Sequence, residues 1–302
     1  MPTPVNISRL PDTLGDMPSA SRPIFAWIVL ALAGSHTLAA PPAYPPKANK
    51  PHPQLILPNL KHDAVTAITS YRGKKVLLVY FASWSVDCHK SLEDWNAKTK
   101  DLIAEGKVVV VGVAQEQSPE RCMLYLQWRQ IDWPVLHDPL NTFEVRSVPA
   151  VVAIDEHGYV RDPDARPESF LEKFVNQTHP KPKTPAYYER DVLQPPKVTR
   201  RIAGDTNAAE DWNRHGTSIV LSWQSALLTE GIESFTNMTG REPKSAVGYF
   251  RLGVTRLLRR ASEFSQSEDS EAAIKAMRKA VALAPKNYVF AQRLAVVTGK
   301  EK

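Results

Sequence analysis

Two continuous apolar runs separated by one helix-length segment most constrain the fold of this chain. They are VLLVYFA at 76–82 and KVVVVGVAQ at 107–115. Runs rich in Val and Leu, without polar alternation, are typical of strands that are buried on both faces. Between them, residues 89–106 carry apolar side chains at helical spacing and end on Gly106. The pattern predicts a right-handed strand–helix–strand unit.

The segments that follow extend this unit. Ser118 as N-cap and Pro119 at the first helical position predict a helix over 118–133. Further along, the pattern predicts a strand over 149–155, then a glycine turn and a further strand within 156–161, and a helix over 167–177. We therefore expect an α/β domain with a central mixed sheet flanked by helices.

The C-terminal part of the chain reads as helix only. Residues 218–235 predict an apolar helix, and 246–261 and 270–297 predict paired antiparallel helices joined by the polar segment 262–270. The α/β fold is thus expected to be followed by a small all-α helical-hairpin domain. The chain has 25 prolines against 13 glycines, and the two proline clusters predict linkers. The expected organisation is a leader (1–40), a linker (41–58), the α/β domain (59–178), a second linker (179–198) and the helical domain (199–302).

The N-terminus has the pattern of an export signal. Arg22 precedes the uncharged run IFAWIVLALAG, and Thr37 and Ala39 suit the −3 and −1 positions of a cleavage site. The segment predicts a signal peptide, or a membrane anchor if it stays uncleaved, and hence a periplasmic or other extracytoplasmic location. The net charge is +6, but the Lys and Arg residues are scattered, so we expect no nucleic-acid partner.

The residues around one cysteine carry a family resemblance. YFASW at 80–84 ends a buried strand, Cys88 follows at a helix start, VPAVVAID includes Pro149, and DEHGYVR forms a hairpin. In this order they resemble the thioredoxin-like redoxins, which include exported thiol–disulfide oxidoreductases and peroxiredoxins, over residues 60–175. The resemblance implies a thioredoxin-like fold, a cis-proline at Pro149 and protein thiols or disulfides as substrates.

The active-site motif departs from the usual Cys-x-x-Cys. Here it reads Ser85-Val86-Asp87-Cys88, and Val79 stands where many thioredoxins have a buried acid. A hydroxyl cannot enter a disulfide, so the ordinary dithiol reaction is excluded at this turn. The resemblance implies Cys88 and Ser85 as the catalytic pair, with Trp84, Val148 and Pro149 shaping the site. The helix start favours a Cys88 thiolate, and Asp87 opposes it.

Two functions from different classes remain open. The first is thiol redox chemistry at Cys88, as thiol–disulfide exchange or peroxide reduction, with Cys122 either as a resolving thiol or simply as a buried apolar residue. Phe81 and Pro149 depart from the peroxiredoxin pattern. The second is a redox-inactive thioredoxin-fold platform that binds polypeptides.

The helical region carries a weaker resemblance, to a tetratricopeptide-type hairpin. The residues that carry it are Leu252, Gly253, Ala273, Met277, Ala280 and Pro285. It implies a protein partner bound through the C-terminal helices, while a purely structural appendage is the alternative. The histidines show no metal-ligand spacing, so we expect no metal and no cofactor.

Overall fold

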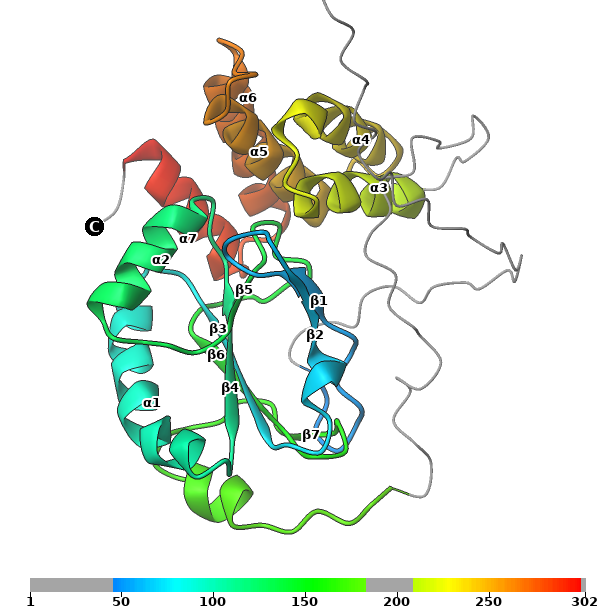
Figure 1. The fold of residues 1–302 in the computed structure, drawn as a ribbon. Coiled ribbons are helices and arrows are strands. Elements are labelled where there is room, and N and C mark those ends of the chain that lie inside the picture. The colour runs from blue at the N-terminus through cyan, green and yellow to red at the C-terminus, as the bar shows by residue number, and fades with distance from the viewer. Residues whose placement is uncertain (1–45, 183–208, 300–302) are drawn as a thin grey trace, which may run out of the picture. The chain divides into compact units, whose positions relative to one another are not determined.

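A five-stranded mixed sheet forms the centre of the first part of the protein. The computed structural model describes residues 46–182 and 209–299, which belong to one compact unit, 40–302. The strand order is β5-β4-β3-β6-β7 (Figure 1). β3 is parallel to β4, β4 is parallel to β5, and β6 is antiparallel to both β3 and β7. The strands are β3 (Val76–Phe81), β4 (Val109–Ala114), β5 (Val135–His137), β6 (Ala150–Ile154) and β7 (Val160–Asp162).

Two helices pack side by side along this sheet (Figure 1). They are α1 (Val86–Ala104) and α2 (Pro119–Trp128), and the Asn96 side chain on α1 bonds the carbonyl of Gln130 after α2. The Ser118 hydroxyl accepts the Arg121 N–H as an N-cap. The prediction of an α/β fold with a mixed sheet flanked by helices is confirmed. α2 ends before residue 133, because the backbone of Gln130 turns to a left-handed φ of 53°.

The amino-terminal boundary of the domain differs from the expectation. Residues 41–58 were expected to be a linker, but strand β1 (Ile56–Pro58) lies within that range and pairs with β2 (Val65–Ala67). Leu55 and Leu57 are buried in the core. These two buried leucines next to the prolines therefore make this segment part of the folded domain. The predicted leader and most of the second predicted linker lie outside the described residues.

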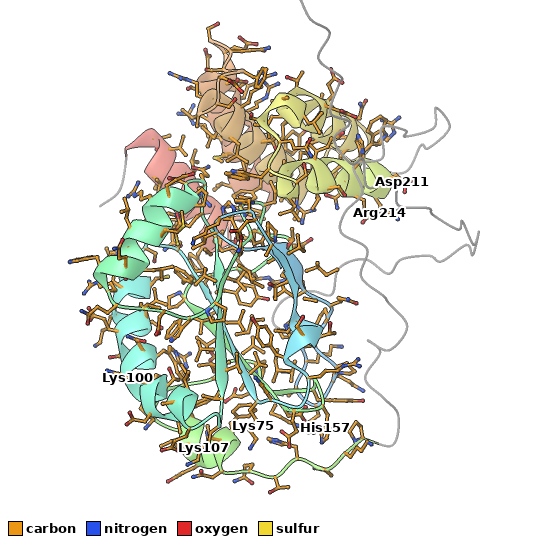
Figure 2. The ribbon with its side chains drawn as sticks, in the orientation of Figure 1. Lys75, Lys100, Lys107, His157, Asp211 and Arg214 are labelled. Carbon is orange, nitrogen blue, oxygen red and sulfur yellow. The ribbon has the colours of Figure 1, made fainter. Side chains whose placement is uncertain are left out.

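The segment after β7 is shorter than the predicted helix over 167–177. It forms one π-helical turn, η2 (Leu171–Val175). The Lys75 ammonium, at the start of β3, donates to the carbonyls of Phe174 and Val175 at 3.2 and 2.6 Å. Figure 2 labels Lys75 at this end of the sheet. The lysine therefore satisfies carbonyls that the short helix leaves free.

The C-terminal region contains five α-helices within residues 209–298. The expected helix over 218–235 is interrupted, because Trp223 adopts a left-handed φ of 54°. Gly253 allows α5 and α6 to approach closely, since a Cβ there would lie 2.7 Å from Met277 Cγ. No helix among the described residues is long and apolar enough to cross a membrane. The helices are α3 (Ala209–Leu221), α4 (Leu228–Arg241), α5 (Ala246–Arg260), α6 (Asp269–Leu283) and α7 (Tyr288–Thr298), with a short 3-10 turn (Ser225–Leu227) before α4.

Candidate functional site

The register of the sheet brings four segments together at one end of the sheet, where β3, β4 and β5 finish and β6 begins. Phe81, the last residue of β3, pairs with Ala114 on β4, and Ala114 pairs with His137 on β5. On the other side of β3, Tyr80 pairs with Ala150. The segments that leave these strands therefore lie next to one another. They are the turn 82–88, residues 115–117, residue 138 onwards, and the loop 145–149 that enters β6.

The turn 82–88 places two buried hydroxyls beside the cysteine. Ser85 is the N-cap residue of α1, but its side chain makes no capping bond. Ser85 is 4% exposed, Ser83 is 7% exposed, and neither hydroxyl forms a hydrogen bond of normal geometry. Buried polar groups are rarely left without a partner. The Ser85 hydroxyl lies near the neighbouring sulfur and lowers the pKa of Cys88.

Cys88 faces the core of the domain. It lies in the first turn of α1, on the buried stripe that continues with Leu92, Trp95 and Thr99, and it has no exposed surface. Its sulfur accepts the Ala82 N–H at 3.5 Å.

Burial has the largest effect on the pKa of Cys88. It raises the pKa of the thiol from 9.0 to about 11, against the lowering by Ser85 and Ala82, and the negative charges of Glu116 and Asp87 add to the rise. The loss of hydration opposes the thiolate that the helix start was expected to favour, and the reactivity of Cys88 stays a prediction.

Cys122 is a second buried thiol. It lies on α2 with no exposed surface, and neither cysteine is in a disulfide. Burial, followed by the charge of Glu116, raises the pKa of Cys122 well above its usual range. Its surroundings suit the interpretation as a buried apolar residue, and the resolving role stays a prediction.

The three residues expected to shape the site lie around the turn. The indole N–H of Trp84 donates to the Gln115 carbonyl at 3.4 Å. Val148 is buried, and the Val148–Pro149 peptide bond is cis. Because Ala150 pairs with Tyr80, Pro149 lies next to Phe81, directly before the turn. The structure thus brings the predicted residues 84, 85, 88, 148 and 149 to the same end of the sheet.

A buried carboxylate that sequence reasoning missed lies at the same place. Glu116 is 2% exposed, and its Oε1 accepts the N–H of Ser83. Burial raises the pKa of Glu116, although Arg293 and the Ser83 hydrogen bonds oppose the rise. Its position directly after a predicted buried strand was a usable signal, because side chains that follow such strands gather at one sheet edge.

Two histidines complete the polar cluster. The Nε2 of His137 donates to the Glu116 carbonyl at 2.9 Å, and its Nδ1 lies 3.0 Å from His62 Nε2. Burial lowers the pKa of His137 to about 3 and that of His62 to about 4. Both rings are therefore neutral near pH 7. Within residues 46–182 and 209–299, no group of three or more His, Cys, Asp or Glu side chains is placed to hold a metal ion.

Arg293 reaches the site from the far end of the chain. It lies on α7 and is 2% exposed, and its Nη2 donates to the Gln115 carbonyl at 2.6 Å. Its guanidinium lies 5.3 Å from the centre of the Trp84 ring. No local sequence pattern points to this contact, because the two residues are brought together by the tertiary fold alone.

Comparison with known proteins places the first part of the chain in a family. Residues 47–172 match the Redoxin family model, and no curated protein sequence matches the chain. Three similar solved structures follow, each with its identity, the shares of this chain and of the other chain that are covered, and the TM-score. They are the thioredoxin domain of a thiol-disulfide oxidoreductase from Bacteroides vulgatus (17%, 43% and 99%, 0.38), a secreted Mycobacterium tuberculosis disulfide oxidoreductase homologous to E. coli DsbE (17%, 40% and 93%, 0.34) and a thioredoxin-family thiol:disulfide interchange protein from Chlorobium tepidum (23%, 39% and 86%, 0.34). Residues 47–172 of this protein are a thioredoxin-like redoxin domain.

Proposed function

We propose that this protein uses its redoxin domain to bind polypeptides and that Cys88 is a structural thiol. The observation that carries the proposal is the state of the motif: position 85 is a hydroxyl, and the sulfur at 88 has no exposed surface. A redoxin that lacks a thiolate at this turn keeps the fold of its family without an autonomous dithiol cycle. Export of the chain is part of the proposal and rests on residues 22–39 alone.

The raised pKa limits what Cys88 does at neutral pH. The thiolate, not the thiol, is the nucleophile. A pKa of about 11 instead of 9.0 lowers the thiolate fraction roughly 100-fold. Peroxide reduction needs both a thiolate and a path for peroxide to the sulfur, so the geometry does not favour it.

The loop before β6 supports polypeptide binding. The Arg146 carbonyl, in this loop, accepts the backbone N–H of Val289 from the C-terminal region at 3.2 Å. The loop therefore has an acceptor for a chain that approaches it from outside the sheet, as in backbone pairing with an extended peptide. We propose unfolded or extended polypeptides as the class of partner. The C-terminal helices would add a second contact to the same partner.

Thiol–disulfide exchange through Cys88 is the second candidate. It is favoured by the Ala82 N–H and the Ser85 hydroxyl, which lower the pKa of the sulfur. In this reaction the Cys88 thiolate attacks a substrate disulfide, a mixed disulfide forms, and one substrate thiolate leaves. A second thiol, from an external reductant, then breaks the mixed disulfide and releases Cys88.

Alkylation rates separate the two candidates. The native protein is treated with iodoacetamide at pH 7.5, and Cys88 and Cys122 are followed by peptide mass mapping, with protein unfolded in guanidinium as the reference. We expect Cys88 to react at least about 100-fold more slowly in the native state, since the thiolate fraction alone falls by that factor. Cys88→Ser and Cys122→Ser assign the two signals.

An exchange assay completes the test. Reduction of insulin disulfides by dithiothreitol is measured with wild type and with Cys88→Ser. Equal rates support the structural thiol. A wild-type rate that depends on Cys88, or native alkylation as fast as in the unfolded chain, would overturn the proposal in favour of thiol–disulfide exchange.

A further inference from the structure

Helix α7 covers the edge of the redoxin domain where the active-site turn lies. Arg293 on α7 and Trp84 in the turn both donate to the Gln115 carbonyl, at 2.6 and 3.4 Å. The guanidinium also lies against the Trp84 ring, 5.3 Å from its centre. One carbonyl thus links the C-terminal helix to the residue that precedes Ser85.

The first turn of α7 makes a second contact, with the loop before β6. The N–H of Val289 donates to the Arg146 carbonyl at 3.2 Å, and Val289 is fully buried. The next residue, Phe290, stacks on Phe250 of α5 with ring centres 4.3 Å apart. Helix α7 (red in Figure 1) is therefore fixed to the loop on one side and to α5 on the other. The α7 contact denotes the hydrogen bonds of Arg293 and Val289 to the carbonyls of residues 115 and 146, together with the stacking of the Arg293 guanidinium on Trp84.

The α7 contact is built on an incompletely paired cation. Arg293 is 2% exposed, its Nε has no hydrogen-bond partner, and it forms no ion pair with any carboxylate among the described residues. Burial lowers the pKa of Arg293 to about 10, although Glu116 and Asp138 oppose the shift. A buried donor without a partner costs free energy that hydration would return. This contact therefore favours opening more than a fully paired one would.

We propose that helix α7 is the intramolecular occupant of the redoxin site and that an external polypeptide gains the site by displacing it. This inference rests on the proposed function, because it names the competitor for the same surface. Helix α7 and the external polypeptide would use the same groups of the redoxin domain. They are the Trp84 ring, which α7 covers with a guanidinium, and the Arg146 carbonyl, which α7 occupies with a backbone N–H.

Hydrogen–deuterium exchange of the full chain tests whether α7 covers the site. In Arg293→Ala we expect the amides of 82–88 and 145–148 to exchange at least tenfold faster than in wild type. Arg293→Lys keeps the charge but loses the planar fork of donors, so we expect an intermediate rate. The matched control is Arg251→Ala, which removes a buried arginine that bonds the Leu140 and Thr142 carbonyls and should leave 82–88 unchanged.

Binding of an unfolded chain tests the competition. The probe is fluorescently labelled, reduced and carboxymethylated lactalbumin, measured by anisotropy. We expect Arg293→Ala to bind it at least tenfold more tightly than wild type, with Arg251→Ala close to wild type. Circular dichroism of each variant shows whether it is folded, and if Arg293→Ala is not, Arg293→Lys provides the comparison.

Each outcome separates this inference from the proposed function. Unchanged exchange at 82–88 and 145–148 in both folded Arg293 variants would show that α7 does not cover the site, as would an equal increase in Arg251→Ala. If wild type binds the probe and Arg293→Ala exchanges faster but binds it no more tightly, α7 does not compete with the polypeptide. If no variant binds the probe although exchange becomes faster, the proposed polypeptide function fails, and the conclusion that α7 covers the site holds.

Discussion

Two buried arginines make different kinds of contact. Arg259 joins two helices within the helical region, and Arg293 joins the helical region to the redoxin domain. Arg259 on α5 donates to both carboxylate oxygens of Asp269, at 2.9 and 2.6 Å, and also to Gln266 and Thr229. Arg293 on α7 has one carbonyl, one aromatic ring and an Nε without a partner. Both side chains are almost fully buried.

The difference indicates which contact is suited to open. A bidentate arginine–carboxylate pair is among the strongest polar contacts in proteins, and it joins α5 to α6 within the helical region. At the redoxin site the cation is only partly satisfied, so separation of α7 from the site restores hydration to groups that lack partners. The α5–α6 pair should therefore persist under conditions that weaken the α7 contact.

The largest expected effect comes from removing the carboxylate partner of Arg259, which leaves it incompletely paired, as Arg293 is. Asp269→Ala leaves Arg259 buried without its carboxylate, and the loss of a partner from a buried ion pair costs about 3 kcal/mol. The free energy of unfolding, measured by urea denaturation, should fall by that amount. Glu268→Ala, at an exposed neighbouring position, is the control and should change it by less than about 0.5 kcal/mol. A similarly small change in Asp269→Ala would contradict the comparison.

Acidification should destabilise the surroundings of Arg293 more than the Arg259–Asp269 pair, because the two arginines have different titratable neighbours. Burial lowers the pKa of His137, which lies in the Glu116 cluster, from 6.5 to about 3. Below pH 6.5 the unfolded chain therefore binds a proton that the folded chain does not bind. The associated stability is complete above pH 6.5 and is lost as the pH falls towards 3, and about 2.7 kcal/mol of it is lost at pH 4.5.

The pair on α5 and α6 should resist the same change in pH. Its hydrogen bonds and charges hold the pKa of Asp269 below its usual range, despite the burial that opposes this, so the carboxylate stays ionised at pH 4.5. The measurement is urea denaturation at pH 7 and pH 4.5 for wild type and His137→Gln, whose amide can still donate to the Glu116 carbonyl. The variant should lose less stability on acidification; equal losses would show that His137 is not the group that titrates.

The smallest expected effect concerns Glu116, which faces both Arg293 and Cys88. Its negative charge raises the pKa of Cys88, after the larger effect of burial. Glu116→Gln should therefore lower that pKa slightly and speed alkylation of Cys88 by about threefold at pH 7.5. The pH dependence of the alkylation rate measures the shift, and Glu120→Gln, at an exposed position on α2, is the control. An unchanged or slower rate in Glu116→Gln would exclude a charge effect of Glu116 on the sulfur.

Most of the sheet and its two flanking helices could be predicted from the sequence. The uninterrupted apolar runs at 76–82 and 107–115 identify strands buried on both faces, and Ser118 with Pro119 marks a helix start, because these signals are local. The candidate site was also predicted in outline, since Trp84, Ser85, Cys88, Val148 and Pro149 lie near strand ends that the register brings together. Segments with weak local signals were predicted less well, as in β1 and the short turn η2.

The sequence by itself determined the type of fold and the absence of a second sulfur at position 85, because hydrophobic patterning and residue identity are properties of the chain. The tertiary structure decided that the Cys88 sulfur lies away from water. A helix start favours a thiolate, but the face of α1 on which the sulfur lies removes it from water, and desolvation is the larger effect. It also decided that Arg293 reaches Trp84, since a contact between residues that far apart in the chain depends on how whole helices pack.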